Sequence, residues 1–316
     1  MPPRSLSPSG FKPGLHPRNP HRHGYDFALL VRASPELAPF VRPSPRGSPS
    51  IDFADPAAVT ALNRALLQAH HGLREWSLPP GYLCPAVPGR VDYVHHVADL
   101  LAADRGGELP HGPGVRALDI GTGANCIYPI VGTHAYGWRF VATEVDPAAL
   151  AAARAIVARH PHLARGVECR LQRTPAHIFR DVIAPGERFH VSFCNPPFHG
   201  SPAEAAAGTR RKRRNLGASS RSETVLNFGG QPAELWCPGG EVGFLRRMIA
   251  ESTADPASCG WFTSLVSKAE NLERLRPLLA RAKAVEVRVI GMAQGQKQSR
   301  ILAWTFLPPE ARAIRA

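Results

Sequence analysis

The sequence Asn195-Pro196-Pro197-Phe198 combines groups that suit the binding of a planar base with an exocyclic amine. Each proline fixes φ and pushes the preceding residue toward extended geometry, so the turn is stiff. The Asn195 side-chain oxygen and the Pro196 carbonyl could then accept both amine hydrogens and favour a pyramidal, nucleophilic nitrogen, while Phe198 stacks on the base. The chemistry implied is methyl transfer to an amine. The alternative is a turn that only ends a strand.

The residues before this turn place it at the edge of a sheet. The β-branched and aromatic run 189–193 is typical of a buried strand. The turn therefore follows the carboxyl end of that strand, where ligands bind in open α/β sheets.

Two further signals lie earlier in the chain. The turn Gly121-Thr122-Gly123 follows a predicted strand at 115–120, and its glycines let the backbone approach a ligand closely. Glu144 ends the next strand, about twenty residues later, where a carboxylate can accept from both hydroxyls of a ribose. Asp119 either neutralises the amino group of a cofactor's amino-acid tail or only anchors the glycine turn. The pattern predicts an adenosine-containing cofactor.

The three signals together distinguish between cofactors. A nicotinamide enzyme would share the glycines and Glu144, but it has no need of a rigid Asn-Pro-Pro-aromatic turn after the fourth strand. S-adenosylmethionine accounts for all three signals.

The elements that must position these residues alternate between strands and helices from residue 115 onward. This order predicts an α/β fold with a doubly wound, seven-stranded sheet. The last two strands have a short connection and form a predicted hairpin, so the last strand is expected to be antiparallel. The predicted strands are 115–120, 139–145, 167–171, 189–193, 261–266, 285–290 and 301–307, and the helices include 147–159, 242–252 and 270–282.

The residues before the sheet predict a mainly helical extension. Residues 1–20 are rich in Pro, Ser, Arg and His and are expected to be disordered when the protein is alone. Asp55-Pro56 is typical of a helix start, with the helix ending near Gly72, and a second helix is predicted at 90–102. The expected organisation is a basic, partly disordered, RNA-binding extension at 1–88 and a catalytic domain at 89–316.

The charge of the chain favours a polyanionic partner. The formal net charge is +13 and the sequence pI is about 10.2, which favours nucleic acid. An arginine-rich proteome that drifts basic is the alternative. The run Arg210-Arg211-Lys212-Arg213-Arg214 is expected to grip an RNA backbone beside the site, since phosphates would offset its self-repulsion. A solvated charge run without a partner is the other interpretation.

No pattern in the sequence predicts a metal, a disulfide framework or a membrane segment. Adjacent histidines such as His70-His71 and His95-His96 point to different helix faces and make poor joint ligands. The amino terminus has no apolar run, so a cytoplasmic protein is expected. The six cysteines contain no Cys-x-x-Cys pair: they are Cys84, Cys126, Cys169, Cys194, Cys237 and Cys259.

On these motifs the chain resembles the RlmF family of 23S ribosomal RNA adenine-N6 methyltransferases, which shares an ancestor with a eukaryotic methyltransferase of spliceosomal small nuclear RNA. The resemblance covers most of the chain, including the extension. The matching stretches are 16–19, 25–27, 81–85, 88–90 with Asp92-Tyr93, 118–130, 142–146, 194–199, 211–216, 226–243 and 294–300.

The resemblance implies a Rossmann-like class I methyltransferase fold and S-adenosylmethionine as the cofactor. Gly121, Gly123 and Glu144 would hold that cofactor, and Arg90 would reach its carboxylate. The turn 195–198 would hold the target adenine, with Asn195 also bordering the cofactor.

The resemblance further implies that the substrate is 23S ribosomal RNA or a large-subunit assembly intermediate, acted on by a monomer. Methylation of another RNA, of DNA or of a protein amide remains an alternative, as does an RNA-binding assembly factor whose methylation is incidental. Two loops are also open to two interpretations. Trp236, in the loop 227–241, either stacks on a base or packs in the core, and the turn 294–300 either touches RNA or is an ordinary hairpin loop.

Overall fold

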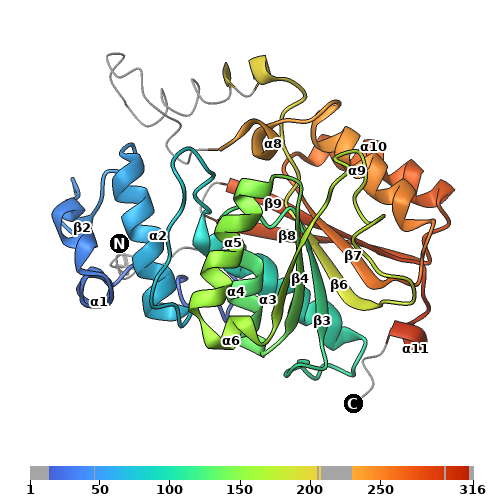
Figure 1. Cartoon of the computed structure of the whole chain (residues 1–316), viewed down its shortest axis with the longest axis horizontal. Coiled ribbons are helices and arrows are strands. Elements are labelled where there is room, and N and C mark those ends of the chain that lie inside the picture. Colours follow the sequence, from blue (N-terminus) through green and yellow to red (C-terminus); the bar gives the residue numbers. More distant parts are fainter. Residues whose placement is uncertain (1–13, 46, 205, 208–229, 295–296, 313–316) are drawn as a thin grey trace, which may run out of the picture.

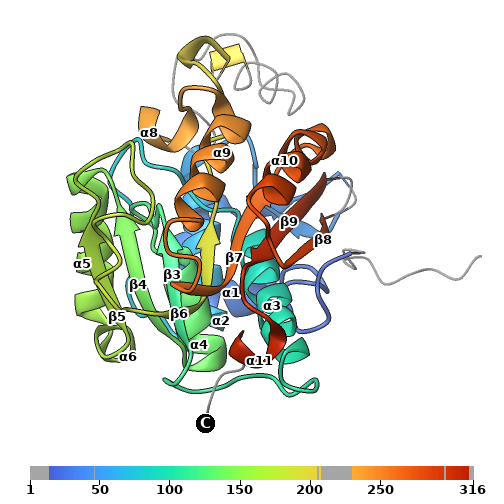
Figure 2. The ribbon, with the colours of Figure 1, turned by 90° about the vertical axis from the view of Figure 1, so that its right-hand side faces the viewer.

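A computed structural model describes residues 14–45, 47–204, 206–207, 230–294 and 297–312. Its centre is a seven-stranded sheet with the order β5-β4-β3-β6-β7-β9-β8 (Figures 1 and 2). Neighbouring strands from β5 to β7 are parallel, while β9 runs antiparallel to both β7 and β8. The predicted doubly wound sheet with an antiparallel last strand is confirmed. The strands are β3 (Arg116–Ile120), β4 (Arg139–Glu144), β5 (Val167–Leu171), β6 (Phe189–Cys194), β7 (Cys259–Val266), β8 (Glu286–Gln294) and β9 (Lys297–Thr305).

Helices cover both faces of this sheet, and alternate residues of each strand serve the two faces. In β3, Ala117 belongs to one hydrophobic cluster and Leu118 to the other. The first cluster contains residues of α3 (Val87–Ala103), α4 (Ile127–Tyr136) and α5 (Pro147–Arg159), and the second contains residues of α9 (Gly240–Ser252) and α10 (Ala269–Arg281). All eight residues of β7 are buried, as befits a central strand covered on both sides.

Local sequence explains where the principal helices begin. The Asp55 side chain accepts from the Ala57 backbone N–H at the start of α2 (Pro56–His70), with proline as the first helical residue. Asp146 makes the same cap for α5 by accepting from Ala148. An N-cap acceptor satisfies a free backbone N–H, and proline at the first helical position sacrifices none.

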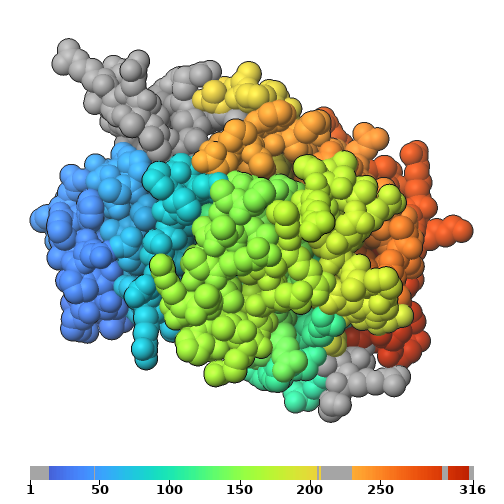
Figure 3. Space-filling view, viewed as in Figure 1, coloured from blue at the N-terminus to red at the C-terminus, as the bar shows by residue number. Residues whose placement is uncertain are grey.

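The extension packs on the first cluster and forms one side of the molecule, coloured blue in Figures 1 and 3. It contains α1 (Phe27–Ala33), a 3₁₀ helix at Pro35–Phe40, the short strands β1 (Arg42–Pro43) and β2 (Pro49–Ser50), and α2. Because extension residues share this cluster with the sheet, the two parts have a common core. A division at residue 88 stays a prediction.

The expected disorder of residues 14–20 is wrong. Leu15, His16 and Asn19 are buried. The His16 backbone N–H and the Asn19 side chain both donate to Asp92 Oδ1 on α3, at 2.8 and 2.7 Å. Composition misleads here because the segment is held by satisfied buried hydrogen bonds rather than by apolar area. Residues 1–13 lie outside the described chain.

The hairpin at the end of the chain is longer than predicted. β8 and β9 continue past the expected ends at 290 and 301, with pairs such as Gly291 with Arg300 and Met292 with Ser299. These positions carry no apolar alternation, so their pairing is set by continuation of the ladder and not by a buried face. Short helices complete the chain: α6 (Pro161–Ala164), α8 (Pro232–Leu235) and α11 (Pro309–Arg312).

Candidate active site

A pocket of about 920 Å³ opens at the carboxyl edge of the parallel strands. The structure brings most of the predicted site residues to this pocket, although they are far apart in sequence. Its lining includes Arg90, Gly121, Gly123, Glu144 and the turn 195–197. Phe198 does not line it, and Asp119 lies buried one residue before its wall.

The glycine turn after β3 requires its two glycines. Gly121 and Gly123 have φ of +69° and +61°, in the left-handed region that side chains with a Cβ rarely adopt. The Thr122 backbone N–H between them donates to Thr143 O at 2.9 Å, which ties the turn to β4. A Cβ on Gly123 would lie 3.2 Å from Asn125 Nδ2, so there is little space for one.

Glu144 is fixed in the pocket wall by backbone donors. Its Oε2 accepts from Gly123 at 2.8 Å, and its Oε1 accepts from Val145 and Asp146 at 2.8 and 3.1 Å. Burial raises the pKa of this carboxyl above its ordinary value, and the three amides oppose that rise. A carboxylate offers about four acceptor positions, so Oε2 retains capacity for a hydroxyl of a ligand.

Asp119 is fully buried, and neither of its carboxylate oxygens has a well-formed hydrogen bond within the described residues, although the nearby Thr122 hydroxyl favours its ionised form. Burial, with a smaller effect from the charge of Glu144, raises its pKa to about 7. An unpartnered buried carboxylate is costly unless a donor arrives. Both roles expected for this residue, a partner for a cationic ligand group and an anchor of the glycine turn, stay predictions.

The turn after β6 lies between two pockets. Asn195 lines the first pocket and also a second one of about 680 Å³, which contains Phe198 and the hairpin residues Met292 and Ser299. Phe198 is 38% exposed, so its ring is free to stack on a planar ligand. Asn195 Oδ1 accepts from Arg90 Nη1 at 3.0 Å. The second pocket suits a base whose amine must reach Asn195 and the first pocket.

Several residues of the site were not predicted. Tyr128, on α4, accepts from Arg90 Nη1 at 3.1 Å. Glu234, on α8, lines the pocket and accepts from Leu83 and Gln231 backbone N–H groups at 3.0 and 2.8 Å. Both lie in stretches that match the family, 118–130 and 226–243, but neither side chain was singled out from the sequence. Gln172 also lines the pocket and immediately follows β5, so the strand-end rule that selected Glu144 could have found it.

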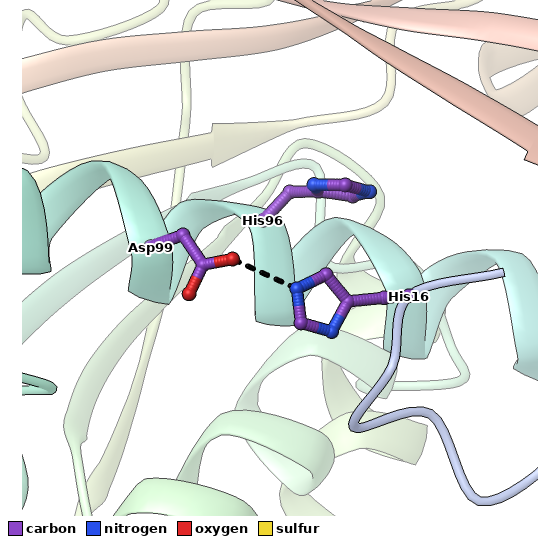
Figure 4. Close-up of side chains that lie close together, drawn as sticks. All are labelled: His16, His96 and Asp99. Carbon is purple, nitrogen blue, oxygen red and sulfur yellow. Dashed lines mark hydrogen bonds and ion pairs between the residues drawn. The ribbon is translucent and has the colours of Figure 1, made fainter.

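One cluster of side chains within the described residues has the spacing of a metal site. Ligand atoms of His16, His96 and Asp99 lie within 4.8 Å of one another, and His16 Nε2 bonds to Asp99 Oδ2 at 2.8 Å (Figure 4). His16 Nδ1, however, accepts from the Arg18 backbone N–H at 3.1 Å. A metal on Nε2 would require a proton on Nδ1, which would then face that N–H. We assign the cluster a structural role in holding residues 14–19 on α3.

The predicted phosphate grip, Arg210 to Arg214, lies outside the described residues. Within the described ranges, no helix has the length and apolar character needed to cross a membrane. Trp236 is partly buried, forms a β-bridge with His199 and belongs to neither core cluster, and its stacking on a base stays a prediction.

Comparison with known proteins gives matches over nearly the whole chain. A family model described as RNA methyltransferase matches residues 9–308. The ribosomal RNA large subunit methyltransferase F of Ectopseudomonas mendocina is 55% identical, with 98% of this chain and 95% of that protein covered. Among solved structures, the catalytic domain of human METTL16 in complex with MAT2A 3′UTR hairpin 1 has a TM-score of 0.77 and 31% identity, covering 93% of this chain and 96% of that chain. The N-terminal domain of human METTL16 in complex with SAH has a TM-score of 0.72 and 28% identity, covering 93% and 99%.

Proposed function

Because the chain belongs to this RNA methyltransferase family, we propose that it methylates the N6 amine of one specific adenosine in 23S ribosomal RNA. The relatives that support the choice of RNA are named ribosomal RNA large subunit methyltransferase F. The stiff Asn195-Pro196-Pro197-Phe198 turn supports the choice of an exocyclic amine on a base. Naked RNA and a large-subunit assembly intermediate are both compatible with the site.

S-adenosylmethionine is the cofactor, and the described residues fit it. It supplies an electrophilic methyl group whose transfer releases a neutral thioether. Glu144 Oε2 accepts a ribose hydroxyl, and the glycine turn 121–123 allows close approach of the ligand to the backbone. The buried Asp119 carboxylate would pair with the ammonium of the amino-acid tail, and Arg90 would pair with its carboxylate.

The chain's own contribution to the chemistry is positioning and charge stabilisation. Asn195 Oδ1 and the Pro196 carbonyl accept the two N–H groups of the target amine, and Phe198 stacks on the ring. Because methyl transfer would place positive charge on the amine nitrogen, these two oxygens would stabilise that charge as it develops. The methylated amine then loses a proton to solvent. Holding the reactants in line supplies most of the rate.

The target must leave its stack to enter the second pocket. Base extrusion costs a few kcal/mol and is easiest from a loop or bulge, so the proposed substrate is a structured RNA loop. The net charge of +13 supports attraction to the RNA backbone. The run Arg210 to Arg214 is the proposed phosphate contact. We further propose that the enzyme acts in the cytoplasm as a monomer and without a metal ion.

One observation carries this proposal: Asn195 lines both the first pocket and the pocket that contains Phe198. The test is incubation with S-adenosylmethionine and 23S RNA that lacks the modification, followed by nuclease digestion and mass spectrometry for N6-methyladenosine. One new methyl group per RNA is expected. Asn195→Ala should bind cofactor and lose turnover, whereas Asn195→Asp keeps an acceptor oxygen and should retain part of the activity.

A substrate panel separates the alternatives. Methylation of duplex or single-stranded DNA in place of 23S RNA would move the assignment to a DNA enzyme. If Asn195→Ala fully restores ribosome assembly in cells that lack the protein, its main role is that of an assembly factor.

A further inference from the structure

Arg90 occupies an unusual place between the two pockets. In the part of the chain that the structure describes, Arg90 and Asn195 are the two residues that line both of them. Arg90 lies in the first turn of α3, which begins at Val87, and is only partly exposed. A change in either pocket therefore reaches its guanidinium directly.

The hydrogen bonds of Arg90 within the described residues all come from one guanidinium nitrogen, Nη1. Both hydrogens of Nη1 are used, one by Tyr128 OH at 3.1 Å and one by Asn195 Oδ1 at 3.0 Å. The guanidinium carbon also lies 5.9 Å from the centre of the Tyr128 ring, and Tyr128 is buried. Nε and Nη2 have no hydrogen bond within the described residues. One edge thus holds the catalytic turn, and the other is available to an anion.

The hydrogen bond from Arg90 to Asn195 works against the methyl transfer proposed for the second pocket. Arginine is always charged, and here it donates to the oxygen that must stabilise positive charge on the target amine. The cation therefore weakens Asn195 Oδ1 as an acceptor and repels the charge that develops beside it. A carboxylate on the free edge of the guanidinium would offset that charge, whether or not Nη1 stays bonded to Oδ1.

We infer that Arg90 couples the two pockets, so that Asn195 becomes a full acceptor for the target amine only when a carboxylate-bearing ligand lies in the first pocket. This inference rests on the proposed function, because it assumes that the second pocket receives the base. Its consequence is an order of events: cofactor binds first, and a base enters productively afterwards. An RNA site would then not be held open by an enzyme whose first pocket is empty.

The test compares two ligands that differ only in the carboxylate. Binding of unmodified 23S RNA is measured at one fixed salt concentration with saturating S-adenosylhomocysteine and with saturating decarboxylated S-adenosylhomocysteine. The carboxylate is expected to tighten RNA binding about ten-fold, within the range typical of coupling between sites. Linkage requires RNA to tighten the binding of S-adenosylhomocysteine more than that of its decarboxylated form, by the same ratio.

Three variants identify the residues responsible. Arg90→Met and Asn195→Ala should each abolish the difference between the two ligands, since one removes the charge and the other the oxygen that it weakens. Arg154→Met is the matched control, because Arg154 is an exposed arginine that contacts Cys169 O away from both pockets. It should keep the full difference. If Arg90→Met does not fold, Asn195→Ala alone tests whether the difference between the two ligands depends on the contact between these residues.

Two results would overturn the inference: equal RNA affinity with both ligands in the wild-type enzyme, or a difference that persists in Arg90→Met. Either can occur in an enzyme that still methylates 23S RNA, which would leave the proposed function intact. An enzyme that binds both ligands but methylates no RNA would contradict the proposed function instead.

Discussion

The backbone N–H of Gly123 donates to Glu144 Oε2 at 2.8 Å, so the turn that follows β3 and the carboxylate that ends β4 fix each other. The Thr122 N–H does the same for the Thr143 carbonyl at 2.9 Å. The shape of the cofactor pocket is therefore set by the left-handed backbone at residue 123, where a β-carbon is costly.

Gly123→Ala is expected to damage the pocket, whereas Gly186→Ala should not. Both glycines have positive φ, +61° and +76°, so each substitution should cost about 1–2 kcal/mol of unfolding free energy. Only the Cβ at residue 123 meets neighbours, 3.2 Å from Asn125 and 3.3 Å from Glu234. Calorimetry should show at least ten-fold weaker S-adenosylhomocysteine binding for Gly123→Ala alone. Equal loss in both variants would contradict a local role.

Asp119→Asn should weaken cofactor binding and change how stability depends on pH. The pKa of Asp119 is raised to about 7, so the folded state holds a proton that the unfolded state releases near pH 4. Its contribution to stability is present below that pH and is lost as the pH rises through 7. Denaturant unfolding at pH 5 and pH 8 should show a decline that the variant lacks.

The matched control for this substitution is Asp255→Asn at an exposed position, which should leave the decline unchanged. Binding of S-adenosylhomocysteine at pH 8 should weaken about ten-fold in Asp119→Asn, a loss typical of one charge-assisted hydrogen bond. Unchanged affinity would show that Asp119 only anchors the glycine turn.

His96→Gln should make the protein less sensitive to acid. Burial, reinforced by the nearby His16, lowers the pKa of His96 to about 4. The unfolded chain then binds a proton below pH 6.5 that the folded chain does not, so this group costs stability as the pH falls from 6.5 toward 4. The stability difference between wild type and variant should change by up to roughly 1.4 kcal/mol per pH unit in that window.

The control for that experiment is His111→Gln, since His111 is exposed. Parallel pH profiles for wild type and His96→Gln would contradict the burial of a neutral imidazole. The pH range from 6.5 to 4 also separates the effect of His96 from that of Glu187. The pKa of Glu187 is about 2, so protonation of Glu187 destabilises the protein only in more acidic solution.

Asp104→Ala should be among the most destabilising substitutions in the chain. Asp104 accepts from Arg312 at 2.7 Å and from the Trp261 indole at 2.7 Å, and the Asp104 and Arg312 side chains are 5% and 1% exposed. Arg312 keeps its ion pair with Glu286 Oε2 at 2.9 Å, but the substitution removes the acceptor of the Trp261 indole and of two guanidinium nitrogens, at a cost of about 3 kcal/mol. Glu270→Ala breaks the exposed Lys268 pair and should cost at most about 1 kcal/mol. Urea unfolding compares the two.

Stretches with regular apolar spacing, and stretches that a capping residue, glycine or proline bounds, were predictable from sequence. The helix at 147–159 and the strand at 167–171 have the predicted ends, because an N-cap and apolar spacing are local signals. Gly121, Gly123, Glu144 and Asn195 reach one pocket because each follows or ends a parallel strand, and such ends share one edge of the sheet.

Contacts made only by folding were not predictable. The roles of Tyr128 and Glu234 were not predicted, although the glycine turn lies close to Tyr128 in sequence, because α4 and α8 bring these side chains to the pocket only by packing. Residues 14–20 were mistaken for a disordered tail because their stability comes from Asp92 and Asp99, over seventy residues away. The composition of a segment does not show hydrogen bonds to residues so far away in the sequence.

The position of β9 has a consequence for how the protein is made. β9 lies between β7 and β8 (Figure 2), and within the described chain β8 has no other strand partner. The sheet is therefore completed by its last strand to be synthesised. The ion pair between Arg312 and Asp104 can form only after that strand has been made. Non-local pairing of this kind is slow to form. A polypeptide that stops before residue 297 leaves β7 and β8 with exposed edges, so the second pocket, which includes Ser299, can exist only in the finished chain.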